Sequence, residues 1–280
     1  MTKGSIYGSE NIYTRDWDLL VILDGCRLDV MEEVVAEEEY PFVDDVKSTV
    51  SPSGMSSGWM YETFTDDHLS DVQDTSYVTA NPHSEVVLGG DHPVDGDDFK
   101  LLDEVWRYAW DEDIGTVTAD DVTDRAISSG RKHDFDRMIV HYMQPHFPSL
   151  SHPQLGSGIN LDEVGDAWSS SIWKQLLRNE IDYDEVWEAY KGNLKVVMES
   201  LGTLLENVDA ERVLITADHG NAFGERGFYG HGEFPIDEIR VVPSIVTSAV
   251  DSQEYKPIDR NYNDTDQSVQ EKLSALGYLD

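Results

Sequence analysis

The chain has 280 residues, of which 56 are acidic and 20 are basic, and its formal net charge at pH 7 is −36. A chain of this length can bury a sizeable core, while its charge repels nucleic acid phosphates and anionic lipid and so disfavours both as partners. The acids are dispersed and lysine is scarce, which predicts a protein adapted to high salt, where the self-repulsion is screened.

The composition predicts a folded protein in a reducing compartment. Hydrophobic residues make up 39% of the chain, too many for an acidic disordered segment. Cys26 is the only cysteine, which excludes an intrachain disulfide and a cysteine-based zinc cluster. The N-terminus has no apolar signal core and no later run approaches membrane-spanning length. We therefore expect a cytoplasmic protein without a membrane span.

The first third of the chain opens with a buried strand. Residues 17–23 form a nearly continuous apolar run of the kind found in parallel sheets, and Asp24 and Gly25 end it. A helical pattern follows from Leu28 and stops near Pro41. Residues 47–58 form a loop rich in hydroxyls and glycine, a helix is expected from about Ser57, and residues 77–82 read as a strand and turn.

The middle third predicts a second clear strand between helices. We expect a loop over residues 84–98, a helix over 99–110, a short strand over 115–118 and a helix from about Ala119. Residues 137–142 are apolar and β-branched enough for a strand. A proline-framed loop over 143–148 and an irregular excursion over 149–165 follow it.

The last third repeats this alternation of helix and strand. One or two long helices are expected over 166–206, joined near 179–184, then a strand over 212–216 and a glycine-rich loop over 220–232. Residues 240–246 predict a strand, and the proline within it makes it an edge or bulged strand. Residues 268–276 predict a terminal helix. The alternation predicts an α/β fold, a mostly parallel central sheet with helices on both faces. We expect one domain over 1–280, with its core at about 15–250 and a C-terminal helical tail at about 251–280.

Polar residues follow three of the predicted strands. Asp218 and His219 end the late strand, Asp24 ends the first, and His141 and His146 end the middle one. Ligands bind at the carboxyl ends of parallel strands, where two carboxylates and an imidazole suit Zn²⁺ or Mn²⁺. Each residue also has an ordinary explanation: Asp24 could cap a helix, His141 could be a core histidine, and Asp218 could belong to a turn.

The hydroxyl-rich loop offers a nucleophile for such a site. A serine hydroxyl becomes reactive when a metal coordinates it. The helix that follows the loop would also point the positive end of its dipole at a bound anion. A flexible loop with a capping serine explains the same residues.

Together these motifs resemble the alkaline phosphatase superfamily, in the sulfatase-like branch and the form common in salt-loving archaea. The resemblance rests on residues 21–29, the serine loop before Trp59, residues 141–148, and residues 216–220 through Gly230 and His231. It covers about residues 17–247 and implies the α/β fold of that superfamily.

The resemblance implies a role for each candidate residue. The metal ligands fall on Asp24, Asp218 and His219. The nucleophile falls on Ser56, with Ser57 and Ser53 as alternatives. Contacts with the substrate anion or its leaving group fall on His141, His146 and His231. Arg27 is expected to hold either the anion or Asp24.

Departures from the family pattern narrow the expected activity. Sulfatases carry Cys or Ser, any residue, Pro, any residue and Arg, and this sequence lacks that spacing near Ser51 and Pro52, so sulfate-ester hydrolysis is disfavoured. We expect a phosphoester hydrolase or transferase acting through Ser56 on a small anionic substrate, with His146 or His231 protonating the leaving oxygen. One divalent ion (Zn, Mn, Mg or Ca) is expected, and a second remains open. The alternative is a non-catalytic member of the fold that serves in binding or assembly.

Overall fold

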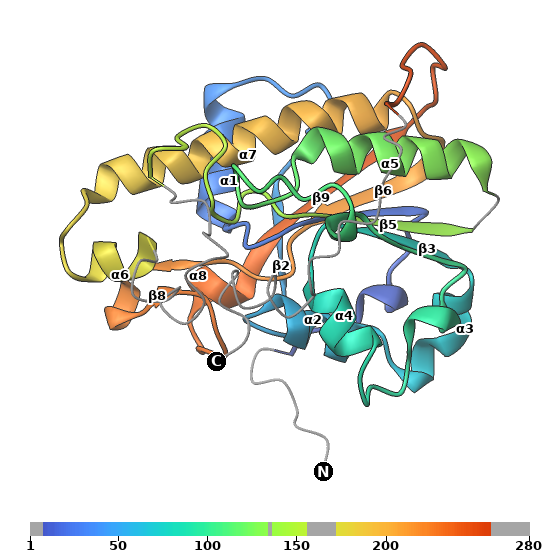
Figure 1. Ribbon diagram of the computed structural model, residues 1–280, viewed down its shortest axis with the longest axis horizontal. Coiled ribbons are helices and arrows are strands. Elements are labelled where there is room, and N and C mark those ends of the chain that lie inside the picture. The colour runs from blue at the N-terminus through green and yellow to red at the C-terminus, as the bar shows by residue number, and fades with distance from the viewer. Residues whose placement is uncertain (1–7, 134–135, 156–171, 259–280) are drawn as a thin grey trace.

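The computed structural model describes residues 8–133, 136–155 and 172–258, and a seven-stranded sheet forms the centre of this part (Figure 1). The strand order is β2-β9-β6-β1-β5-β3-β4. The strands from β6 to β4 run parallel, and β9 and β2 run antiparallel to their neighbours. The strands are β1 (Leu19–Leu23), β2 (Lys47–Val50), β3 (Thr75–Thr79), β4 (Leu101–Glu104), β5 (Arg137–Tyr142), β6 (Ala210–Thr216) and β9 (Val241–Ala249), with a separate hairpin of β7 (Ala222–Phe223) and β8 (Tyr229–Gly230).

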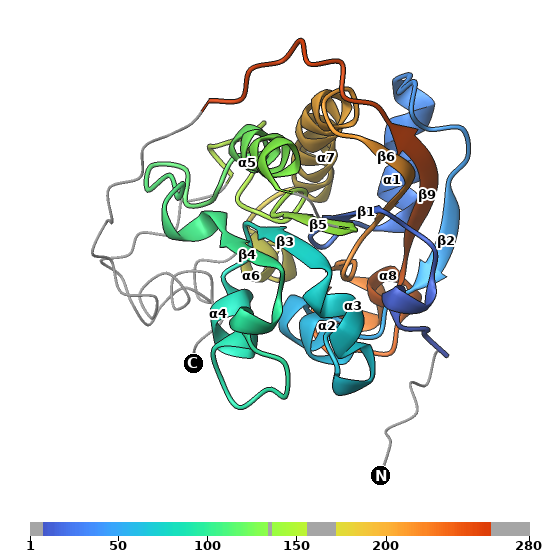
Figure 2. The same ribbon diagram turned by 90° about the vertical axis from the view of Figure 1, so that its right-hand side faces the viewer.

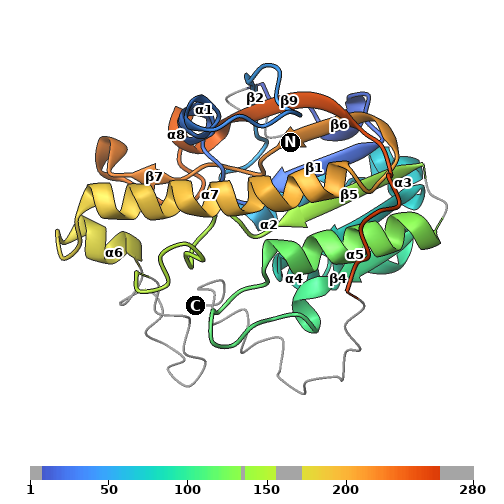
Figure 3. The ribbon, with the colours of Figure 1, turned by 90° about the horizontal axis from the view of Figure 1, so that it is seen from above.

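Helices cover both faces of the sheet (Figure 2). One face packs against α1 (Leu28–Glu37), α5 (Ala119–Lys132) and α7 (Tyr183–Leu205), which lie over the sheet in Figure 3. The other face packs against α2 (Ser56–Thr63), α3 (Leu69–Gln73) and α4 (His83–Leu88). The remaining helical segments are α6 (Ile172–Leu177), α8 (Asp237–Arg240), η1 (Ile12–Thr14), η2 (Asp66–His68), η3 (Gly96–Asp98), η4 (Val105–Arg107) and η6 (Glu225–Gly227).

The apolar run of β1 divides between these two cores. Successive strand side chains point to opposite faces, so Leu19, Val21 and Leu23 enter the α1/α5/α7 side. Leu20 and Ile22 enter the α2/α3/α4 side. Because both faces are buried, the strand needs no polar alternation, and the predicted α/β fold with helices on both faces is confirmed.

Two predicted elements of the middle region are wrong. Residues 99–110 hold β4 and η4 rather than a helix, because Leu101–Glu104 pairs in parallel with β3 at the edge of the sheet and this pairing outweighs local propensity. Residues 115–118 hold a single bridge between Asp111 and Thr116, and Thr118 caps α5 by accepting from the amide of Asp121.

Other predicted boundaries also change. The expected loop over 47–58 contains β2, the expected loop over 84–98 begins inside α4, and β9 lies between β2 and β6, so Pro243 is not on an edge strand. The predicted helix over 268–276 and part of the predicted excursion over 149–165 lie outside the described residues. Among the described helices, none has the length and apolar character needed to cross a membrane.

Candidate metal centre

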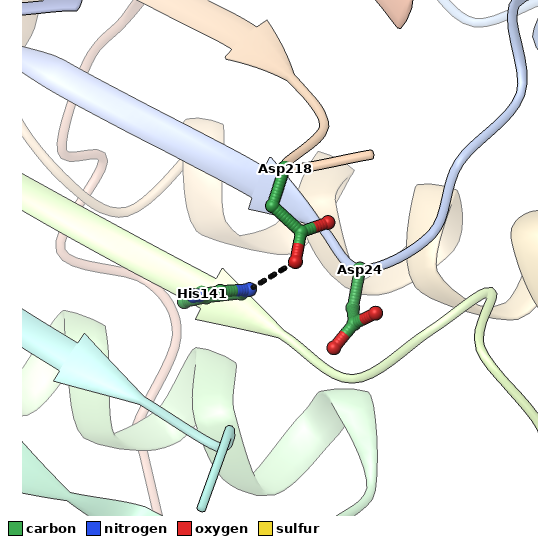
Figure 4. A group of neighbouring side chains, drawn as sticks. All are labelled: Asp24, His141 and Asp218. Atoms are coloured by element: carbon green, nitrogen blue, oxygen red, sulfur yellow. Dashed lines mark ion pairs between the residues drawn. The ribbon is translucent and has the colours of Figure 1, made fainter. Parts of the chain in front are cut away.

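The carboxyl ends of β1, β5 and β6 bring the predicted polar residues together. In the register of the sheet, Ile22 pairs with His141 on one side and with Thr216 on the other. Asp24 and Asp218 therefore leave neighbouring strands at the same edge, beside His141 (Figure 4). Asp24 does not cap α1, whose N-cap residue is Arg27. One ligand atom each from Asp24, His141 and Asp218 lies within 4.8 Å of the other two, a grouping that can hold a metal ion.

Each carboxylate has one oxygen held by the protein and one left over. Asp24 Oδ2 accepts from Asn81 Nδ2 at 2.7 Å, and Asp218 Oδ1 accepts from the amides of Gly25 and His219 at 3.0 and 2.9 Å. Asp24 Oδ1 and Asp218 Oδ2 are fully buried and accept no hydrogen bond. A buried anionic oxygen without a donor is costly, so the two oxygens fit a site built for a cation.

His219 adds a nitrogen lone pair to these oxygens. Its Nδ1 lies 2.8 Å from the Gly220 carbonyl, to which it donates, so Nε2 carries the lone pair. Nε2 lies 3.6 Å from Asp24 Oδ1 and 3.5 Å from Asp218 Oδ2. Tetrahedral zinc with bonds of about 2.0 Å has ligands about 3.3 Å apart, so both distances from His219 Nε2 are close to those in a metal shell.

Gly25 allows the chain to turn directly after Asp24. Its φ is +67°, and an added Cβ would lie 2.7 Å from Asn221 Nδ2. A side chain there would strain the backbone and push Asn221 away. The turn at the end of β1 therefore depends on glycine.

Ser56 places its hydroxyl against the same ligands. It is the first residue of α2, it is 1% exposed, and its Oγ lies 3.3 Å from His219 Nε2 and 3.4 Å from Asp24 Oδ2. Ser53 Oγ instead contacts Met55 O and the Glu233 carboxylate. Of the two serines, the first helical residue is thus the one at the ligands.

The two buried carboxyls influence each other. Burial, and then the charge of Asp218, raise the pKa of Asp24 well above its usual range. Burial also raises the pKa of Asp218, but His219 and His141 outweigh it and hold that pKa below its usual range. In the absence of a cation, the pair therefore favours one negative charge over two.

His146 and His231 form a second pair beside the first group. Their Nε2 atoms lie 3.2 Å apart, His146 Nδ1 donates to Phe147 O at 2.6 Å, and the His231 ring stacks on His219 at 4.5 Å. Burial, and then the charge of His219, lower the pKa of His146 to about 4 and that of His231 well below its usual range. Both imidazoles are therefore neutral at neutral pH.

His141 and Arg27 lie apart from any open surface. His141 is 0% exposed, its Nδ1 lies 2.9 Å from the Tyr77 hydroxyl, and its Nε2 lies 3.6 Å from Asp218 Oδ2. Arg27 is 4% exposed and donates to Asp29, Glu225 and Asn221 O. Contact of either residue with a substrate anion stays a prediction, and the partners of Arg27 favour a role in holding the 221–225 loop.

Two residues of the site were missed by the sequence reasoning. Asn81 orients Asp24, and His83, 5% exposed, has a pKa lowered to about 3 by burial and then by the charge of His219. Both follow β3, a third neighbour in the sheet. The polar residues after this strand were a signal of the same kind as those after the other three.

Comparisons with known proteins identify the fold. No family model and no curated protein matches the chain. The soluble domain of lipooligosaccharide phosphoethanolamine transferase A from Neisseria meningitidis matches with a TM-score of 0.54 at 13% identity, over 86% of this chain and 78% of that one. The C-terminal periplasmic domain of a phosphoethanolamine transferase from Campylobacter jejuni matches with a TM-score of 0.50 at 13% identity, over 82% of this chain and 78% of that one. A 2-O GAG sulfatase matches with a TM-score of 0.51 at 13% identity, over 86% of this chain and 66% of that one.

The chain has an alkaline phosphatase/sulfatase-like fold, which it shares with these domains. The fold predicted from the order of the motifs is thereby confirmed. At these identities the likeness concerns the fold, and its haloarchaeal form stays a prediction. In this sulfatase-like fold, the residues predicted as ligands and nucleophile lie together at one edge of the sheet.

Proposed function

We propose that this protein is a metal-dependent hydrolase or transferase of phosphoesters, with Ser56 as its nucleophile and a small anionic phosphomonoester or phosphodiester as its substrate. The supporting observation is the position of the Ser56 hydroxyl, 3.3 Å from His219 Nε2 and 3.4 Å from Asp24 Oδ2. The unpaired oxygens of Asp24 and Asp218 lie 3.6 and 3.5 Å from the same His219 nitrogen.

Asp24, Asp218 and His219 would hold the ion. Two carboxylate oxygens and one imidazole suit Zn²⁺ or Mn²⁺ better than Mg²⁺ or Ca²⁺, which prefer oxygen alone. When bound, the ion lowers the pKa of the serine hydroxyl and neutralises charge on the phosphoryl oxygens. One ion is proposed, and the facing nitrogens of His146 and His231 would suit a second.

Ser56 would attack the phosphorus through Oγ. Oγ gives its proton to Asp24 Oδ2, toward which it donates at 3.4 Å, and forms a bond to phosphorus. The bond to the leaving oxygen breaks, and that oxygen keeps the electron pair and takes a proton from His146 or His231. Water or an acceptor alcohol then removes the phosphoryl group from Ser56. The start of α2 supports both steps, because Met55 provides no side-chain cap and the first-turn amides stay available to an anion.

Protonation of the leaving group by His146 or His231 needs a change in pKa. With a pKa of about 4, His146 is a neutral imidazole at neutral pH and has no second proton to give. A bound phosphate dianion raises the pKa of a neighbouring imidazole. We therefore propose that the acid role predicted for these residues operates only with substrate in place.

Phosphoesters are favoured over sulfate esters. Ser56 is followed by Ser57, Gly58 and Trp59, without the proline and arginine of the sulfatase pattern. Cys26 is fully buried among the apolar residues beside α1, so it offers no substitute nucleophile.

The test compares Ser56→Ala with Ser57→Ala, which removes the next hydroxyl of the same helix. Turnover of chromogenic phosphomonoester, phosphodiester and sulfate ester is measured in high salt with Zn²⁺ or Mn²⁺, and intact mass spectrometry after an acid quench detects a phosphoryl group on the chain. We expect Ser56→Ala to lose both turnover and the adduct, and Ser57→Ala to keep both. Metal binding without turnover of any ester would instead support the binding or assembly role. Full activity of Ser56→Ala would overturn the proposal.

A further inference from the structure

The His141 ring lies on the α2 side of the sheet between two aromatic side chains. Thr79 of β3 pairs with His141 of β5, so Tyr77, two residues before Thr79, points to the same face. The Tyr77 ring stacks near the imidazole at 29°, and Trp59 of α2 meets it edge-on with centroids 5.7 Å apart. These neighbours leave the ring little freedom to turn.

Hydrogen bonds on this face determine which nitrogen of His141 carries the hydrogen. The Tyr77 phenol, 2.9 Å from His141 Nδ1, can either donate or accept a hydrogen bond. Asp218 Oδ2, 3.6 Å from His141 Nε2, can only accept. A hydrogen on Nε2 suits both neighbours, because the phenol can then donate its own hydrogen to Nδ1. Nδ1 then accepts, and the hydrogen of the neutral ring is on Nε2.

That N–H faces one of the two unpaired carboxylate oxygens. His141 Nε2 lies 3.6 Å from Asp218 Oδ2 (Figure 4), and neither atom has a hydrogen-bond partner. At this distance the contact is electrostatic rather than a full hydrogen bond. A nitrogen that bears a hydrogen has no lone pair to give to a metal.

We propose that Tyr77 and His141 are positioning residues for Asp218. Tyr77 fixes the tautomer of His141, and the His141 N–H orients the ligand oxygen of Asp218. His141 itself binds neither the ion nor the substrate. This inference rests on the proposed function only in taking Asp218 as a metal ligand. It adds Tyr77, which lies within β3, to a site that already includes Asn81 and His83 after that strand.

The first test reads the tautomers by NMR. The protein labelled with ¹⁵N-histidine is examined without metal and during a Zn²⁺ titration. We expect His141 to show hydrogen on Nε2 throughout and His219 Nε2 to shift as zinc binds. A hydrogen on Nδ1 of His141, or a zinc-dependent shift of its Nε2 like that of His219, would overturn the inference. If His219 does not shift, the proposed ion site fails instead, while the tautomer of His141 is still read in the metal-free protein.

The second test measures Zn²⁺ affinity by competition with a chromophoric chelator. Loss of a group that orients a ligand typically weakens metal binding by about 10–100-fold, and we expect Tyr77→Phe to reach the low end, about tenfold. His141→Gln, whose amide N–H can replace the imidazole N–H, should bind zinc more tightly than His141→Ala. Tyr13→Phe is the control, because it removes another buried phenol on the same face, one that is bonded to Thr75, and it should leave affinity unchanged. Wild-type affinity in Tyr77→Phe, or equal losses in both His141 variants, would contradict the inference.

Discussion

At the scale of single residues, the site combines groups that are costly to bury. Asp24, Asp218 and His219 are all 0% exposed, and two ligand oxygens among them lack donors. Such an arrangement lowers the stability of the empty protein and becomes favourable only when a cation enters. Stability measured without metal should therefore reveal the site.

Asp24→Asn should stabilise the metal-free protein. The carboxyl is charged in the unfolded chain at neutral pH, but burial and the charge of Asp218 raise its pKa in the folded protein, so folding must protonate it at a cost. The amide removes this cost, and Asn81 can still donate to the remaining carbonyl oxygen. We expect a gain on the order of 1–2 kcal/mol in the free energy of unfolding, as for other functional residues that are replaced by neutral ones. Urea unfolding with a chelator present measures it. Asp67→Asn makes the same substitution at an exposed position and should have little effect. A loss of stability in Asp24→Asn would contradict the expectation.

His146 should make the metal-free protein acid-sensitive. Its pKa is about 4 when folded against an ordinary value of 6.5, so the unfolded chain takes up a proton first as the pH falls. The stability from the neutral ring is complete above pH 6.5 and is lost progressively down to about pH 4, by about 3 kcal/mol. Chelated wild type and His146→Gln are compared by urea unfolding across this range. The variant should lose less stability than the wild type as the pH falls. If the free energies of unfolding of the two proteins fall in parallel with pH, His146 is not the source of the acid sensitivity.

At the scale of elements, two loops from distant parts of the sequence hold the start of α2. Gly232 N donates to Gly54 O at 2.9 Å, and a Cβ on Gly54 would lie 1.9 Å from Gly232 O. The backbones meet this closely only because Gly54 has no side chain. The same contact joins the loop before Ser56 to the residue after His231.

Gly54→Ala should therefore disturb both stability and activity. One loop must move, which we expect to cost about 2 kcal/mol or more and to separate Ser56 from His219. Gly130→Ala in α5 is the matched control, because its Cβ would meet Met138 and Val208 at 3.4 and 3.6 Å and should stabilise the helix by about 0.5–1 kcal/mol. Thermal melts and ester turnover of both variants measure the contrast, and equal effects would contradict it.

At the scale of the whole molecule, the net charge of −36 opposes the compact state. Raising KCl from about 0.1 to about 1 M shortens the Debye length from about 10 to about 3 Å, and the melting temperature should rise with it. The measurement is made with chelator present, so that the metal site does not contribute. Betaine at equal osmolality, which does not screen charge, should raise the melting temperature less. A melting temperature independent of KCl would contradict the predicted adaptation to salt.

The sequence by itself determined the strands that are buried on both faces and the polar residues that end them. The runs before Asp24, His141 and Asp218 are apolar because helices cover both faces of the sheet. The local pattern was therefore enough to predict β1, β5 and β6. The order of these motifs also determined the fold. At the edges the pattern failed, since β2 and β4 are short and partly exposed and exist through pairing with β9 and β3.

Only the tertiary structure decided how these residues act on one another. The contacts of Ser56 with His219 and of Asn81 with Asp24 join segments that are far apart in the chain. Such contacts also decide which oxygen of each carboxylate is left unpaired. The low pKa of His146 has the same origin, since burial and a neighbouring charge are properties of the packed site. Residue types show which chemistry is available, but distances and desolvation, which set the energies of charged groups, exist only once the strands have assembled.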